Sequence, residues 1–188
     1  MSKLYNQIDS SLAKWIQRQK VFFVSTAPLS QDGHINCSPK GGDTFRIIDP
    51  HTVAYLDFTG SGIETVAHLR ENKRILIMLC AFEGAPKIVR LHGKGEALFP
   101  GDREHDSLLT KFPSYKGSRS IIRVRVERIS DSCGFGVPLM KFKSHRNDIK
   151  RWVEVRSPQE IAAYRRGKNK TSIDGLPGLD ETWVTGAE

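Results

Sequence analysis

Residues 49–74, DPHTVAYLDFTGSGIETVAHLRENKR, combine features of a strand, a glycine-rich loop and a helix in direct succession. The β-branched and aromatic run 52–58 is typical of a strand, and Asp49-Pro50-His51 before it is typical of a turn. Apolar residues from Ile63 to Leu69 recur on one side of a helix that we expect to end near Asn72. The loop 59–62 therefore leads from a strand into a helix.

Short strand candidates dominate the chain on both sides of this unit. The expected strands cover 21–26, 34–38, 45–48, 52–58, 75–82, 87–98 and 122–127, and the expected helices cover 7–19, 63–72, 102–112 and 157–168. The apolar run 75–82 predicts a central strand with both faces covered, by barrel interior and helix or by a second subunit. Gly93 and Gly95 predict a bulge or barrel corner in the next strand.

Six or seven short strands with few helices predict a mainly β fold, a closed or split barrel with helices on its outside. The barrel is expected within 1–131. A loop, helices and a tail over 132–188 are expected to pack on it as part of the same domain. Ser157, Pro158 and Glu160 form the expected start of a helix in this segment, with a capping serine and a proline in the first turn.

Composition and length limit the class of protein. The chain has 188 residues, of which 38% are hydrophobic and 27% charged, so it has enough apolar material for a packed core. The run 75–82 is far shorter than the roughly 20 residues that cross a bilayer, and the N-terminus lacks an apolar signal core. These features predict a cytoplasmic protein. The three cysteines predict no disulfide framework, and Cys133 is interpreted as a small buried residue.

The net charge of +8 is concentrated near the C-terminus. Ten basic residues, among them Arg165, stand against three acidic ones between Lys141 and Lys170. Apolar positions such as Trp152 and Tyr164 alternate with these charges, which is typical of a segment with one face packed against the protein and the other face solvated. We favour this solvated face over a nucleic-acid surface, because charge alone is not a nucleic-acid-binding signature.

The loop Thr59-Gly60-Ser61-Gly62 is the first candidate for chemistry. Unpaired N–H groups at a helix N-terminus suit a phosphate, and Thr59, Ser61 and Thr65 add hydroxyl groups. The alternative is structural: Ser61 caps the helix and Glu64 completes a capping box. Neither a Walker loop nor a Rossmann fingerprint is present.

The second candidate is the stretch Asn36-Cys37-Ser38-Pro39-Lys40. Pro39 is expected to end ladder pairing, which would leave Lys40 where the strand leaves the sheet. Its ammonium would then reach an anion on the glycine-rich loop if the two strand ends are neighbours, whereas a solvated lysine is the simpler interpretation. The six histidines show no metal-ligand spacing, so no metal is expected, and no catalytic acid, base or nucleophile is evident.

Four long segments carry a resemblance to a known family. They are 49–74 and the stretches DGHINCSPKGGDTFR, SDSCGFGVP and SIDGLPGL, which begin at Asp32, Ser130 and Ser172. The chain resembles the pyridoxamine 5′-phosphate oxidase-like proteins with an FMN-binding split barrel, over about 20–131 in general and over nearly the whole chain for an uncharacterised branch. The resemblance implies a homodimer of six-stranded split barrels with FMN in clefts between the subunits.

The resemblance also implies which residues hold the flavin. The strand that contains Asn36, Cys37, Ser38 and Pro39 would run beside the flavin ring, and Lys40 would reach the flavin phosphate. Thr59, Gly60, Ser61 and Gly62, with Thr65 nearby, would bind the same phosphate. Arg90 or Arg74 would supply the charge that other members place where this chain has Gly62 and Ile63.

Substrate and activity stay open at this point. The tail lacks the Arg-x-His-Asp/Glu-Arg type motif of the vitamin B6 oxidase, so true pyridoxamine phosphate oxidase activity is not expected. We hypothesise that the loop 133–136, with Phe135, and the tail stretch SIDGLPGL line the flavin cleft. The leading interpretation is an FMN-dependent oxidoreductase that acts on a small-molecule substrate or a reduced nicotinamide. The alternatives are a non-catalytic flavin-binding or sensor protein, an F420-dependent reductase and, less favoured, a nucleic-acid-binding barrel.

Overall fold

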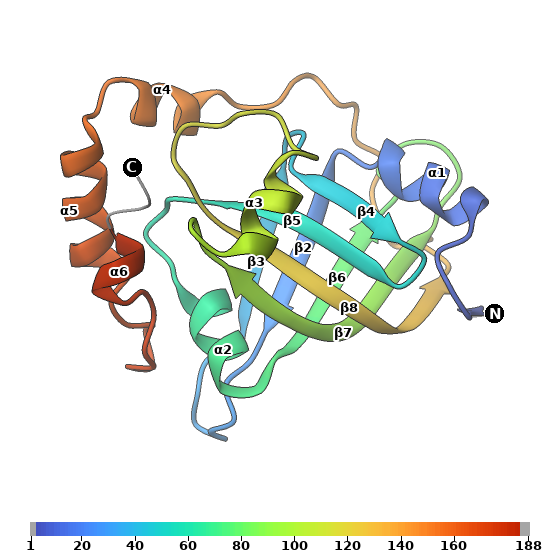
Figure 1. Cartoon of the computed structure of the whole chain (residues 1–188). Coiled ribbons are helices and arrows are strands. Elements are labelled where there is room, and N and C mark those ends of the chain that lie inside the picture. Colours follow the sequence, from blue (N-terminus) through green and yellow to red (C-terminus); the bar gives the residue numbers. More distant parts are fainter. Residues whose placement is uncertain (1–2, 185–188) are drawn as a thin grey trace.

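A curled antiparallel sheet forms the centre of the computed structural model, which describes residues 3–184 (Figure 1). Its strands are β1 (Leu4–Tyr5), β2 (Val21–Thr26), β3 (Asn36–Gly41), β4 (Phe45–Asp49), β5 (Thr52–Phe58), β6 (Arg74–Cys80), β7 (Ile88–Leu98) and β8 (Ser118–Ser132). They follow the order β3-β2-β6-β7-β8-β5-β4, with β1 paired to β8. The described chain therefore has eight strands rather than six or seven, because the two-residue β1 is too short to leave a pattern in the sequence.

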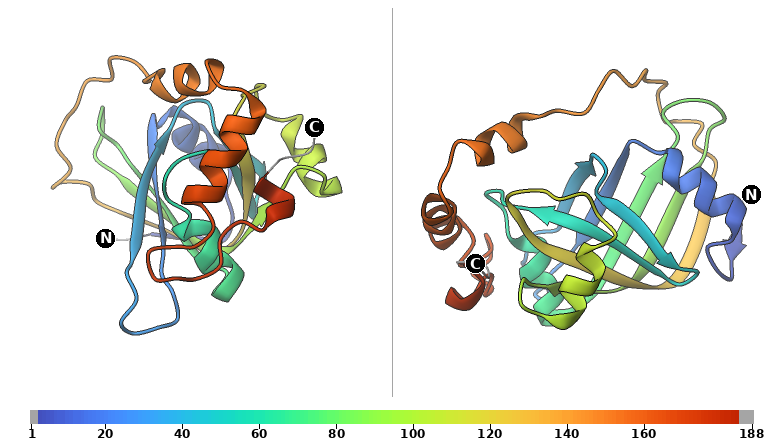
Figure 2. Two further views of the ribbon diagram at one scale, coloured as in Figure 1. Left: turned by 90° about the vertical axis from the view of Figure 1, so that its left-hand side faces the viewer. Right: turned by 45° about the horizontal axis from the view of Figure 1, so that its top comes forward.

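Six helices among the described residues flank the sheet. They are α1 (Ser10–Arg18), α2 (Glu64–Asn72), α3 (Arg103–Leu109), α4 (Asp148–Glu154), α5 (Pro158–Lys168) and α6 (Glu181–Val184). Helix α1 lies at one end of the curled sheet, whereas α5 and α6 lie on the opposite side (Figure 1). The segment 133–147, here called the strap, runs along one rim from the end of β8 to α4 (Figure 2). No helix in the described range is long and apolar enough to span a membrane.

Strand β6 is central, as the apolar run predicted, because it pairs with β2 on one side and β7 on the other. Ile77 and Leu79 point into the main core and are almost fully buried. Leu76 and Met78, on the other face of the same strand, are only half-buried. The inner face is thus covered by this chain, and the outer face is not.

The β2–β3 hairpin departs from the expectation in its register. Pro39 does not end the ladder: β3 continues to Gly41, with Pro39 opposite Phe23 and Lys40 opposite Phe22. Strand β3 lies at the edge of the sheet, where a proline is tolerated because its missing N–H faces no further strand. Lys40 therefore lies inside the strand rather than beyond its end.

Two predicted helix starts have different outcomes. At α5 the capping box is confirmed, since the Ser157 side chain accepts a hydrogen bond from Glu160 N and the Glu160 carboxylate accepts one from Ser157 N. At α2 the predicted capping box is wrong: the N-cap is Ile63, without a side-chain cap, and Ser61 is exposed. The helix begins at Glu64, two residues later than a capping box from Ser61 would place it, so Gly62 and Ile63 stay outside the helix.

The predicted bulge is present, because the β7–β8 register shifts between His92 and Gly93. A Cβ added at Gly93 would lie 2.1 Å from the carbonyl oxygen of Arg125 in the facing strand. Gly93→Ala is expected to lower the free energy of unfolding by about 1–3 kcal/mol, since the two backbones must separate. Urea unfolding measures this change.

Gly136→Ala is the matched control, since a Cβ there meets nothing within 4 Å. It is expected to change the free energy of unfolding by less than about 0.5 kcal/mol. Equal stability of the two variants would show that the strands do not approach so closely at the bulge.

Candidate functional site

The glycine-rich loop 59–62 is held in place by side chains that donate hydrogen bonds to its carbonyl oxygens. The side-chain amide of Asn169 donates to the carbonyl oxygen of Gly60 at 2.9 Å and to that of Ser61 at 3.4 Å. Arg119 Nη1 donates to the carbonyl oxygen of Gly62 at 3.0 Å. Because the C=O and N–H of a trans peptide unit point in opposite directions, the N–H groups that follow these carbonyls point away from Asn169 and Arg119.

These loop N–H groups are available for a ligand. They belong to Ser61, Gly62 and Ile63, and within residues 3–184 no residue accepts a hydrogen bond from them or from the N–H of Gly60. Helix α2 begins directly after them, and its N-terminus adds a positive electrostatic potential. The loop therefore presents donors of the kind that bind phosphate groups at helix N-termini.

Asp57 lies beneath the loop and joins two cations. It is at the end of β5, 1% exposed, and its Oδ2 accepts from Arg119 at 2.6 and 2.9 Å. Its Oδ1 accepts from Lys40 Nζ at 3.1 Å. Lys40 is therefore neither simply solvated nor distant from the loop: β3 brings its ammonium to the residue that precedes Phe58 and Thr59.

A third cation reaches the loop from the C-terminal segment. Arg165 of α5 donates from Nε to Thr59 Oγ1 at 3.0 Å and from Nη2 to the carbonyl oxygen of Ser118 at 3.1 Å. Arg165 is 5% exposed, so its assignment to a solvated basic face is wrong. Its neighbour Arg166 is exposed, as predicted. Arg165 is buried because the hydroxyl group of Thr59, which is itself buried, accepts a hydrogen bond from its guanidinium.

The charges of this cluster do not balance. Burial raises the pKa of Asp57, but the charges and hydrogen bonds of Arg119 and Lys40 outweigh it, so the pKa lies below its usual range. Burial and, to a smaller degree, the charge of Arg119 lower the pKa of Arg165 to about 10, and the charge of Asp57 only partly offsets them. Three cations thus accompany one buried carboxylate beneath the loop, and the half-buried Glu64 places a second carboxylate beside Gly62. The loop environment is complementary to an additional anion.

The predicted residues of β3 divide between the two faces of the strand. Asn36, Ser38 and Lys40 are half-buried, whereas Cys37 and Pro39 alternate with them and are exposed. Asn36 donates from Nδ2 to Thr65 Oγ1 at 3.0 Å and accepts from the Ser38 hydroxyl at 3.0 Å. The structure therefore brings Asn36, Ser38 and Thr65 together on the inner face.

Asn36 also connects to a buried histidine. Its amide donates to Thr26 Oγ1 at 3.2 Å, and this hydroxyl lies 2.9 Å from His68 Nδ1. Burial lowers the pKa of His68, and nearby carboxylates, that of Asp174 first, only partly offset the effect. A neutral His68 thus helps to fix the orientation of the Thr26 hydroxyl and, through it, of the Asn36 amide.

Arg90, Arg74 and Phe135 lie away from this site in the described chain. Arg90 lies on the outer face of β7, opposite Met78, and donates to Ser132 Oγ at 2.9 Å. Arg74 donates to the carbonyl oxygen of Pro28 at 3.2 Å. Phe135 is 83% exposed in the strap.

The loop 133–136 and the tail stretch SIDGLPGL lie at different ends of the sheet. Gly134 packs against the backbone of Lys87, just before β7, whereas Asp174 binds His34, just before β3. Cys133 is exposed, so its interpretation as a buried residue is wrong. It follows directly after the last residue of β8, where the chain leaves the sheet.

Sequence analysis missed Asp57, Arg119, Arg165 and Asn169 as parts of the site. Asp57 and Arg119 lie on paired strands and are separated by 62 residues, and Arg165 is 106 residues from Thr59. The one available signal was the acidic Asp57 inside an otherwise apolar strand, because a buried carboxylate requires a cationic partner. No group of three or more potential metal-ligating side chains occurs in the described part of the chain.

Comparisons with known proteins agree with this architecture. The chain is 36% identical, over 95% of its length and 78% of the relative's, to the pyridoxamine 5′-phosphate oxidase family protein ustO of Aspergillus flavus. Its fold is similar to that of a single-residue variant of HupZ from Group A Streptococcus, with a TM-score of 0.52 and 21% identity, over 66% of this chain and 99% of that one.

A second solved structure gives the same result for the fold. It is a putative pyridoxamine 5′-phosphate oxidase from Lactobacillus delbrueckii, with a TM-score of 0.51 and 17% identity, over 68% of this chain and 98% of that one. The family model for pyridoxamine 5′-phosphate oxidase matches residues 8–133, which include the whole sheet from β2 to β8. By this match and by the 36% identity, the chain belongs to the pyridoxamine 5′-phosphate oxidase family.

Proposed function

We propose that this protein binds FMN and acts as an FMN-dependent oxidoreductase with a substrate other than pyridoxamine phosphate. The observation that carries the proposal is the charge imbalance beneath the loop 59–62, where Lys40 and Arg119 both bind the buried carboxylate of Asp57 and the buried Arg165 binds Thr59. A phosphate would supply the missing negative charge, and the free N–H groups of the loop would bind its oxygens.

The residues present fit the phosphate end of a flavin nucleotide. Lys40 and the loop 59–62 provide the phosphate donors, and Asn36 and Ser38 on the same face of β3 would lie along the ring. The flavin supplies a hydride acceptor when bound, and the protein supplies its orientation and surroundings. F420 carries a phosphate as well and is the alternative cofactor.

The outer face of the sheet supports a homodimer. Phe23, Leu76 and Met78 are half-buried there, and Cys37 and Pro39 are exposed beside them. A second copy of the chain would cover this face, which explains why β6 is apolar on both sides.

The dimer also gives Arg90 a role. Arg90 extends from the outer face and Lys40 from the inner one, so the two cations cannot serve one anion within a protomer. Across a two-fold interface, Arg90 of one copy would face the cleft of the other. We assign it to the flavin site of the neighbouring protomer.

The visible absorbance spectrum of the freshly purified protein tests the proposal. Mass spectrometry of what heat releases identifies the cofactor, and sedimentation gives the mass of the assembly. We expect a yellow dimer that releases stoichiometric FMN and oxidises NADH or NADPH. A colourless protein that takes up neither FMN nor F420 would overturn the proposal.

Turnover separates the enzyme from a non-catalytic flavoprotein. If the protein binds FMN but oxidises neither NADH, NADPH nor reduced F420, a flavin-binding or sensor role replaces the oxidoreductase part of the proposal. Flavin binding itself would then stand.

A further inference from the structure

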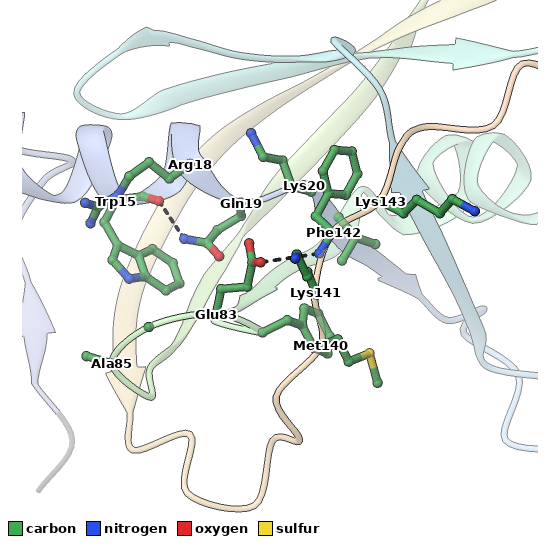
Figure 3. A pocket seen from close by; sticks show the side chains of 13 residues that line it. Trp15, Arg18, Gln19, Lys20, Glu83, Ala85, Met140, Lys141, Phe142 and Lys143 are labelled. Carbon is green, nitrogen blue, oxygen red and sulfur yellow. Dashed lines mark hydrogen bonds between the residues drawn. The ribbon is translucent and has the colours of Figure 1, made fainter.

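A cavity of about 730 Å³ lies outside the residues assigned to the flavin (Figure 3). Its walls come from the end of α1, the β6–β7 connection and the strap, and none of Lys40, Thr65 or the loop 59–62 lines it. The volume falls within the range of roughly 300–1,000 Å³ that is typical of small-molecule sites. The cavity therefore has the size of a binding site in its own right.

Two hydrogen bonds hold the strap in place as a wall of this cavity. Met140 N donates to the carbonyl oxygen of Phe82 at 2.9 Å. Phe142 N donates to Glu83 Oε1 at 3.3 Å (Figure 3). His145, further along the strap, accepts from Gly42 N at 3.2 Å. The strap is thus attached to both the β6–β7 connection and the residue after β3.

The lining combines aromatic and apolar side chains. Trp15 from α1, Phe82 after β6, and Met140 and Phe142 from the strap all contribute. Met140 is 55% exposed and Phe142 39% exposed, which is costly for large apolar side chains unless something covers them. A planar apolar group between these side chains would bury them.

The charged side chains at the rim determine whether the cavity favours an anionic or a cationic ligand. Arg18, Lys20, Lys141 and Lys143 line the cavity, and none of the four forms an ion pair with any residue in the described range. Glu83 is the one acidic residue of the lining, and its carboxylate already accepts from Phe142 N. The free positive charge favours an anionic ligand.

We propose that this cavity binds a planar aromatic anion, with its ring system between Trp15 and Phe142 and its carboxylate beside Lys20 and Lys141. The Lys20 ammonium lies 5.7 Å from the centre of the Phe142 ring, so charge and ring surface are adjacent. The site is separate from the flavin site, and the inference does not depend on flavin binding.

Isothermal titration of the purified protein with naphthoate, and with the neutral naphthamide of the same shape, tests the proposal. We expect saturable binding of naphthoate and about tenfold weaker binding of naphthamide, because the amide lacks the charge that the lysines recognise. The double variant K20M/K141M is expected to lose this preference, and Phe142→Ala to weaken both ligands.

Lys14→Met is the matched control, since Lys14 lies on the same helix, is exposed and does not line the cavity. It should bind naphthoate as the unmodified protein does. The proposal is overturned if naphthoate does not bind, if naphthamide binds equally well, or if the K20M/K141M protein, folded by circular dichroism, binds as the control does. Flavin content is measured in the same samples, so that failure of the flavin proposal is recognised separately.

Discussion

Replacing Asp57 by asparagine is expected to lower the free energy of unfolding by about 3–5 kcal/mol. The carboxylate is 1% exposed and accepts hydrogen bonds from Lys40 and twice from Arg119. Asparagine keeps the shape but removes the one negative charge of the cluster. The guanidinium of Arg119, whose side chain is 4% exposed, is then left as a buried cation without a counter-ion. Urea unfolding at neutral pH measures the loss.

Asp43→Asn is the control for this substitution. Asp43 pairs with Arg46 at 2.6 Å, but its side chain is 62% exposed. Solvent screens such pairs, so the expected change is at most about 1 kcal/mol. Equal losses for the two variants would show that the Asp57 pair contributes no more than a surface ion pair.

The pH dependence provides a second check of the Asp57 charge. The pKa of this carboxyl is lower in the folded protein than in the unfolded chain, because Arg119 and Lys40 outweigh the effect of burial. Its contribution to stability is therefore present above the unfolded pKa of about 3.9 and is lost as the pH falls through the folded pKa. The difference between wild type and Asp57→Asn should stay constant above about pH 5 and shrink in stronger acid. A difference that grows in acid would contradict this assignment.

Local patterns predicted the elements but not their partners. The run 52–58 and the apolar run 75–82 are strands, because β-branched and apolar side chains fit a buried sheet. Ser157, Pro158 and Glu160 start α5 as predicted, since all contacts of that cap lie within four residues. Structure that depends on residues close together in the sequence can therefore be predicted from a local sequence pattern.

The site depends on contacts of long range, and here prediction was incomplete. Loop 59–62 and Lys40 were identified as separate candidates, but their connection through Asp57 requires the pairing of β5 with β8 and the curl of the sheet. The Ser61–Glu64 spacing fits a capping box, yet Asn169 and Arg119 hold the loop carbonyls in another conformation. The hydrogen bonds from Asn169 and Arg119 thus hold the loop in a conformation without the Ser61 cap that the local sequence favours.

Arg165→Met is expected to weaken FMN binding about tenfold and to leave riboflavin binding unchanged. Arg165 orients Thr59 from beneath the loop 59–62, and no carboxylate among residues 3–184 accepts a hydrogen bond from it. Burial and the charge of Arg119 lower its pKa to about 10, so an added anion would relieve an existing electrostatic cost. Because riboflavin lacks the phosphate, it gains nothing from this charge. Fluorescence titration of the apoprotein with both flavins gives the two affinities.

The comparison of the two flavins distinguishes a positioning role at the phosphate from a merely structural role. A general loosening of the fold would weaken FMN and riboflavin alike, whereas loss of the phosphate interaction changes only FMN. Arg166→Met is the matched control: Arg166 is the next residue in α5, its side chain is 49% exposed, and it pairs with Glu181 at 3.1 Å. We expect this control to bind FMN normally. If Arg165→Met binds FMN as the Arg166 control does, the phosphate is held without the C-terminal helix, and the charge imbalance at the loop has another origin.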